Sequence, residues 1–152
     1  MMGELSGGCV CGTVRYVVTE GSRFLPYACH CTDCQTRTGS AFSENLLIAR
    51  GSLRIEGDLD QGTYSQSGRG VSSTYGCLNC KVQIFAKNTK RPGLLSLRSG
   101  TLDRSSEIVP TAHFWIRSKQ AWIRLPDGAT ALLEQPATAA EWLKLVGKPA
   151  GD

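Results

Sequence analysis

Hydrophobic residues fall in short segments rich in β-branched and aromatic side chains, separated by Gly, Pro, Asp and Ser. Segments of this kind are typical of β-strands. The pattern predicts strands at 12–19, 42–49, 52–57, 71–76, 82–86, 94–100, 113–117 and 121–126. We therefore expect a mainly β fold.

Only two places favour a helix. One is a turn or two directly after Cys34, and the other is a C-terminal segment in which Thr138 can cap the helix while Glu141 reaches back. Gly147 and Pro149 are expected to end this C-terminal helix. Its inner face would consist of Trp142, Leu143 and Val146.

The chain has 152 residues, 41% of them hydrophobic, and shows no internal repeat or linker, so we expect one domain spanning 1–152. No apolar run approaches the length of a membrane span. The N-terminal MMGELSGGCV lacks the basic region and apolar core of an export signal. These features predict a soluble, non-exported, cytoplasmic protein without a membrane partner.

Seven cysteines are present, an odd number, and they occur in C-x-C and C-x-x-C clusters. Without an export signal, this pattern favours metal thiolates over disulfides. The formal charge of +4 counts these thiols as neutral. Seven thiolates and two zinc ions would reduce it to about +1. Because the basic residues are also scattered, we expect no nucleic-acid partner.

The spacing within each cluster indicates how it could bind a metal. On a strand, Cys9 and Cys11 would share one side and leave an apolar side opposite, formed by Val10, Val14, Tyr16 and Val18. A C-x-x-C turn, as at Cys77 and Cys80, brings two sulfurs toward one ion.

Seven ligands divide most simply into four and three. A closed four-thiolate site from Cys9, Cys11, Cys77 and Cys80 would be structural, whereas Cys29, Cys31 and Cys34 would leave one position open, as in catalytic sites. Spacing also allows a zinc ribbon that pairs Cys31 and Cys34 with Cys77 and Cys80. The partition therefore stays open on spacing alone.

Four segments resemble the glutathione-dependent formaldehyde-activating enzyme family, which includes the centromere protein V-like proteins. They are GGCVCGTVRY, CHCTDCQTRTGSAF, YGCLNCKVQIF and PTAHFWIRSKQAWIRLPDG, which together extend from Gly7 to Gly128. The resemblance implies a β-tent of stacked antiparallel sheets that holds two zinc ions. It also implies that Cys9, Cys11, Cys77 and Cys80 bind the structural zinc and that Cys29, Cys31 and Cys34 bind the catalytic one.

One residue departs from the family pattern. Family members usually have glycine after the second C-x-x-C pair, where this chain has Lys81. Because a positive φ is strained for lysine, we expect this turn to differ slightly without loss of the ligands.

Zinc bound by three thiolates is a poor Lewis acid toward water, but it suits a fourth sulfur. A substrate thiol there would be deprotonated and could add to a small aldehyde. This agrees with the family's reaction, the reversible combination of formaldehyde with glutathione to give S-hydroxymethylglutathione, formally a carbon-sulfur lyase. The expected partner is a small-molecule thiol such as glutathione. The alternatives are a non-catalytic zinc-binding interaction module and a redox or metal-buffering protein that uses Cys31 and Cys34 as a dithiol.

Other side chains have structural interpretations beside functional ones. His30 is expected to point away from the ligands, His113 to be a half-buried strand residue, and Asp33 to cap a turn. Thr38-Gly39-Ser40 fits either a turn or a group near the metal. Arginine could bind the carboxylates of a peptide-like thiol, although surface positions are the default. The arginines considered are Arg37, Arg69 and Arg98, and the tryptophans expected in packing roles are Trp115, Trp122 and Trp142.

Overall fold

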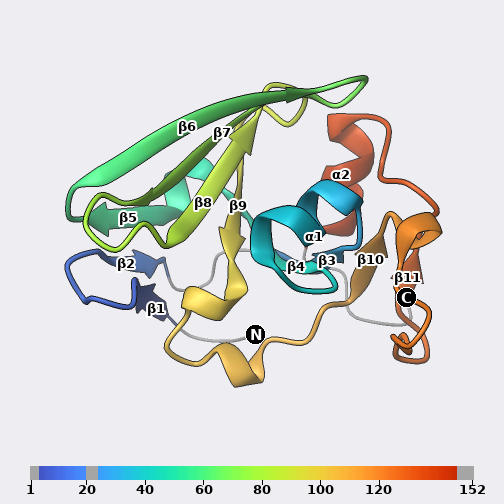
Figure 1. Cartoon of the computed structure of the whole chain (residues 1–152), viewed down its shortest axis with the longest axis horizontal. Coiled ribbons are helices and arrows are strands. Elements are labelled where there is room, and N and C mark those ends of the chain that lie inside the picture. Colours follow the sequence, from blue (N-terminus) through green and yellow to red (C-terminus); the bar gives the residue numbers. More distant parts are fainter. Residues whose placement is uncertain (1–3, 20–23, 147–152) are drawn as a thin grey trace.

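The computed structural model of the chain describes residues 4–19 and 24–146, which form two stacked sheets with two short helices (Figure 1). The larger sheet has the order β11 (Thr130–Ala131), β10 (Ala112–Phe114), β3 (Phe24–Cys29), β4 (Ser43–Ala49), β9 (Leu94–Arg98), β8 (Gln83–Asn88), β7 (Gly70–Cys77) and β6 (Leu59–Gln66). The smaller sheet has the order β1 (Leu5–Gly8), β2 (Arg15–Val18) and β5 (Leu53–Glu56). The helices are α1 (Thr32–Thr38) and α2 (Ala139–Leu145). The expectation of a mainly β fold is confirmed.

The main core lies between the two sheets. Alternate residues of a strand point to opposite faces, so Leu46 and Ile48 of β4 share one face of the large sheet. They pack with Leu95 and Leu97 of β9 against the apolar side of β2. This apolar side consists of Val14, which directly precedes β2, and of Tyr16 and Val18 within it. This contact joins the sheets into one structure.

A second core covers part of the opposite face of the large sheet. Trp142 of α2 packs edge-on against Tyr27 and Phe114, with ring centroids 5.4 and 4.9 Å apart. Thr138 caps α2 by accepting from the Glu141 amide, as expected, while the Glu141 carboxylate accepts from the Ala137 amide.

The expected inner face of this helix is correct for two of its three residues. Trp142 and Val146 are buried, but Leu143 is 55% exposed, so its assignment to that face is wrong. The helix stop predicted at Gly147 and Pro149 lies outside the described residues. Within the described ranges, neither helix has the length and hydropathy that a membrane span requires.

Strands β3 and β6 were not predicted because neither has a clear alternating pattern. β3 contains Pro26, which cannot donate to a neighbouring strand. This is tolerated because the pairing of β10 with β3 begins one residue later, at Tyr27, and the Pro26 carbonyl accepts from the Thr111 amide at 2.9 Å. β6 is mostly polar because it lies at an exposed edge of the sheet.

Two expectations for the C-terminal third are wrong. The strand expected at 113–117 ends at Phe114, because Trp115 adopts a φ of 60° and begins a 3-10 turn. The segment 121–126 forms turns and irregular structure. In addition, β10 pairs in parallel with both β3 and β11, so the large sheet is mixed and not wholly antiparallel.

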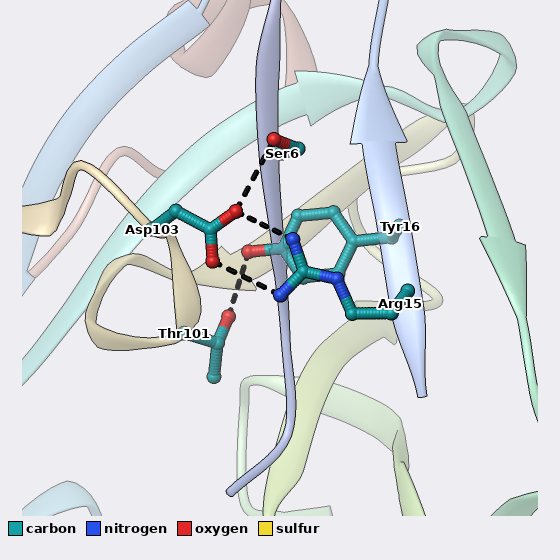
Figure 2. A network of polar contacts seen from close by, with 5 residues as sticks. All are labelled: Ser6, Arg15, Tyr16, Thr101 and Asp103. Atoms are coloured by element: carbon teal, nitrogen blue, oxygen red, sulfur yellow. Dashed lines mark hydrogen bonds and ion pairs between the residues drawn. The ribbon is translucent and has the colours of Figure 1, made fainter. Parts of the chain in front are cut away.

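A polar network joins the small sheet to the loop after β9 (Figure 2). Arg15 makes a two-pronged ion pair with Asp103, which also accepts from the Ser6 hydroxyl. Beside it, the Tyr16 hydroxyl lies 2.8 Å from Thr101 Oγ1, and burial raises the pKa of Tyr16 to about 12. Since the ion pair is half exposed, it contributes mainly orientation.

Gly7 allows this close approach. A Cβ at Gly7 would lie 2.3 Å from the Thr101 carbonyl oxygen and 2.5 Å from Tyr16 Oη. Gly7→Ala is therefore expected to lower the free energy of unfolding by about 1–3 kcal/mol, measured by urea denaturation of metal-saturated protein. The matched control is Gly51→Ala, since a Cβ there meets open space. Equal stabilities of the two variants would show that Gly7 is not confined.

Lys81 has a φ of 66°, so the turn after Cys80 keeps the left-handed conformation that glycine would favour. The expectation that this turn differs is therefore wrong. The Lys81 amide donates to the Cys77 carbonyl at 2.9 Å, and its ammonium group pairs with Asp60 at 2.9 Å. These contacts hold lysine in a conformation that costs about 1 kcal/mol or more.

Lys81→Gly and Lys81→Ala both lose the ion pair with Asp60, so the two variants differ mainly in backbone strain. We expect the glycine variant to be more stable by about 1 kcal/mol in urea denaturation. At Lys87, within β8, the same pair of substitutions should show the reverse order because glycine weakens a strand. If Lys81→Ala were at least as stable as Lys81→Gly, the backbone at position 81 would not be strained.

Candidate functional site

Cys29, Cys31 and Cys34 converge at the junction of β3 and α1. Cys29 ends β3, Cys31 is the N-cap of α1, and Cys34 lies in its first turn. Their sulfur atoms all lie within 4.8 Å of one another. The helix thus begins before Cys34, not after it, because Cys31 Sγ accepts from the Cys34 amide at 3.3 Å. The sequence motif therefore supplies the helix cap and the cluster together.

The three thiols of this cluster influence one another's ionisation. Hydrogen bonds from Cys29 and Cys34 lower the pKa of Cys31 well below its usual range, and Arg69 adds to the effect. The pKa of Cys29 is raised, first by its hydrogen bond with Cys31 and then by that with Cys34. One thiolate is therefore stabilised by its two neighbours and a guanidinium group.

Cys9, Cys11, Cys77 and Cys80 form the second cluster, again with all sulfur atoms within 4.8 Å. Cys9 and Cys11 lie in a turn after β1 and not on a strand, so the expected alternation is wrong for them, and Val10 is 87% exposed. Val14, Tyr16 and Val18 share a buried apolar side, as expected. Cys77 ends β7, and its sulfur accepts from the Cys80 amide at 3.3 Å. Two turns therefore meet to form this cluster.

Both clusters suit a thiolate-binding metal. Sulfurs about 2.3 Å from a tetrahedral zinc lie about 3.8 Å apart. The Cys9–Cys11 and Cys11–Cys77 sulfur separations are 3.6 and 3.7 Å. Hydrogen bonds from Thr13, followed by Asn79, lower the pKa of Cys11 to about 5. All seven cysteines are free thiols, and they group in the partition of four and three.

A pocket opens beside the three-cysteine cluster, on the face of the large sheet opposite the main core. Cys29 and Cys34 form part of its wall, and its cavity volume is about 60 Å³. Next to them, Ser43 and Asn45 project from β4 into the same space and are both buried. The four-cysteine cluster does not contribute to this wall.

Three arginines line the pocket: Arg69, Arg91 and Arg98. Arg69 lies over the Trp115 ring and Arg91 over the Trp142 ring, each 4.6 Å from the ring centroid. Arg37, by contrast, lies over Tyr64 and is not part of the wall. Arg91, Ser43 and Asn45 were not among the predicted site residues. The polar residues within the apolar strand 42–49 were an available signal for Ser43 and Asn45, whereas Arg91 lies in the turn between β8 and β9 and had none.

His30 and His113 pack behind the cysteine cluster as a buried pair. His30 Nε2 lies 2.9 Å from His113 Nδ1, and the His30 ring also contacts Phe42. Burial, followed by the charge of His113, lowers the pKa of His30 to about 4, and burial lowers that of His113. His30 thus points toward His113 and away from the cysteine sulfurs, as expected. His113, expected to be half-buried, is buried and does not line the pocket.

The remaining candidates have structural roles. Asp33 does not cap α1, since Cys31 does; its carboxylate accepts from Gln66. Thr38-Gly39-Ser40 forms the exposed turn that ends the helix, with Gly39 at a φ of 69°. Trp142 is buried and Trp115 half-buried, but Trp122 is 70% exposed, so a packing role for Trp122 is wrong.

The chain is similar to one family of proteins in sequence and to a solved structure in fold. A solved structure of a Rhodobacter sphaeroides protein, a structural-genomics target, aligns with a TM-score of 0.50 at 15% identity. The alignment covers 84% of this chain and 98% of the other, and it supports the fold alone. No curated protein matches the chain. The family model described as glutathione-dependent formaldehyde-activating enzyme matches residues 4–118, and the chain belongs to this family.

Proposed function

We propose that the protein is a zinc-dependent carbon-sulfur lyase that acts on a thiol adduct. In this proposal it catalyses the reversible formation of S-hydroxymethylglutathione from glutathione and formaldehyde. The carrying observation is that the three-cysteine cluster borders a pocket through Cys29 and Cys34. Three protein sulfurs leave a metal accessible to a further ligand from that side. Membership of the family supports the choice of substrates.

Each cluster has a separate role in the proposal. Cys9, Cys11, Cys77 and Cys80 would hold a structural zinc, and Cys29, Cys31 and Cys34 a catalytic one. When bound at the second cluster, zinc would supply a soft Lewis acid that favours the deprotonated form of a substrate thiol.

The surrounding residues prepare the pocket for a charged thiol. Arg69 stabilises negative charge on Cys31, and the Ser43 hydroxyl hydrogen-bonds Cys34. Phe114 and Trp142 form an apolar part of the wall. The narrow cavity would hold the thiol and a small aldehyde close together, which lowers the entropic cost of their reaction.

Metal content tests the two-site arrangement. Wild-type protein dialysed against metal-free buffer should retain about two zinc ions per chain, and Cys29→Ser about one, by elemental analysis. The Cys29→Ser variant should keep most of its stability. The comparison variant Cys77→Ser should instead lose several kcal/mol of unfolding free energy, because structural metal binding contributes to folding. A single zinc ion in both wild type and Cys29→Ser would rule out the arrangement.

Thiol entry tests the enzyme hypothesis. With three- and four-sulfur sites both filled, X-ray absorption should give a mean of about 3.5 sulfurs per zinc, rising to about 4 when glutathione is added. S-methylglutathione, which lacks the thiol, should not raise the value. If both sites are filled and the mean number of sulfurs per zinc does not change when glutathione or other thiols are added, the non-catalytic zinc-binding module is favoured instead.

A further inference from the structure

Arg98 differs from the other arginines of the pocket in how it is held. It lies on β9 directly opposite Asn45 of β4, and its NH1 group donates to Asn45 Oδ1 at 3.3 Å. With its amide oxygen turned toward the guanidinium, Gln83 accepts from Nε and NH2 at 3.3 Å. Two neutral amides therefore orient this side chain without neutralising its charge.

The pocket has an excess of positive charge. Its wall contains three arginines and no aspartate or glutamate. The ion pairs found among the described residues involve Arg15, Lys81, Arg104 and Arg117, and so none of the pocket arginines. Three thiolates with one divalent ion carry −1, which leaves about +2 for a ligand to balance. An anionic ligand is therefore favoured over a neutral one.

A polar track connects the cysteine cluster to Arg98. Ser43, paired with Cys29 across β3 and β4, hydrogen-bonds Cys34 and accepts from Asn45 Nδ2 at 2.9 Å. Asn45 in turn contacts Arg98. From β3 to β9 the track crosses two strand spacings, about 10 Å. This span suits a thiol whose carboxylate lies several bonds from its sulfur.

Space limits which part of such a thiol can enter. At about 60 Å³, the cavity has room for roughly two waters, too little for a whole tripeptide. An adjoining depression of about 330 Å³ shares Arg69, Gln135 and Trp142 with the cavity. An elongated thiol could place its reactive arm inside and the rest in this depression, which also contains Lys90.

We infer that Arg98 determines substrate specificity by binding a carboxylate of an elongated, anionic thiol whose sulfur lies at the cysteine cluster. The inference rests on the proposed function. Arg69 and Arg91 are less suited to this role because each stacks on a tryptophan, and Arg69 already interacts with Cys31. A guanidinium oriented by amides can offer a fork to a carboxylate without first breaking an ion pair.

The test uses probes that cannot coordinate metal through a thiol. Binding of S-methylglutathione and of its diethyl ester to the zinc-loaded protein is measured by calorimetry. Wild type should prefer the acid by about 10- to 100-fold, the usual effect of charged hydrogen bonds. Arg98→Gln should bind both probes with similar affinity, whereas Arg98→Lys should keep part of the preference. Arg54→Gln, at an exposed position of the small sheet, should behave as wild type.

The outcomes separate this inference from the proposed reaction. If acid and ester bind wild type equally, if the acid does not bind, or if Arg98→Gln keeps the full preference, the inference is wrong. If Arg98 had only a structural role, its substitution would weaken the binding of both probes equally and leave the ratio of their affinities unchanged. If Arg98→Gln fails to fold, the ratio of acid to ester affinity in Arg98→Lys decides between the two roles. A structural role predicts the same ratio as in wild type, whereas carboxylate binding predicts a lower one. If thiols fail to enter the zinc shell, the proposed reaction is wrong, but a preference for the acid that depends on Arg98 would still support this inference.

Discussion

Side chains of β4 point alternately to two different environments. Leu46 and Ile48 face the small sheet and form the main core, while Ser43 and Asn45 face the pocket. Because this alternation has a period of two, a shift of one residue in register would place polar groups in the core and leucines in the pocket. The pairing of β4 with β3 and β9 therefore fixes the core, the cysteine cluster and Arg98 together.

The cysteine pairs within each motif could be predicted from sequence because their geometry is local. C-x-x-C segments bring two sulfurs together through a short turn, and family resemblance chose between the partitions that spacing allowed. The strand assumed for Cys9 and Cys11 was wrong, yet a turn serves equally well to gather two sulfurs. Strands such as β4, β7 and β8 were also predicted with nearly correct bounds, because their β-branched, leucine and aromatic residues are visible in the sequence.

The pocket could not be predicted, since its residues come from strands distant in sequence. Asn45 becomes a partner of Arg98 only through the register of β4 and β9. Likewise, Trp115 in a left-handed conformation ends β10, although its segment has the composition of a strand. Here tertiary packing overrides local propensity, as it does at Pro26 in β3.

The two clusters differ in how much chain they enclose. Cys29, Cys31 and Cys34 belong to one short segment, whereas Cys11 and Cys77 are 66 residues apart. A metal at the second cluster would act as a cross-link, and closing a loop of that length in the unfolded chain costs about 4 kcal/mol. The local cluster could collect its metal while the chain is still incomplete. The distant one can close only after β7 and its turn have reached the N-terminal segment, so its occupancy would require this long-range contact to have formed.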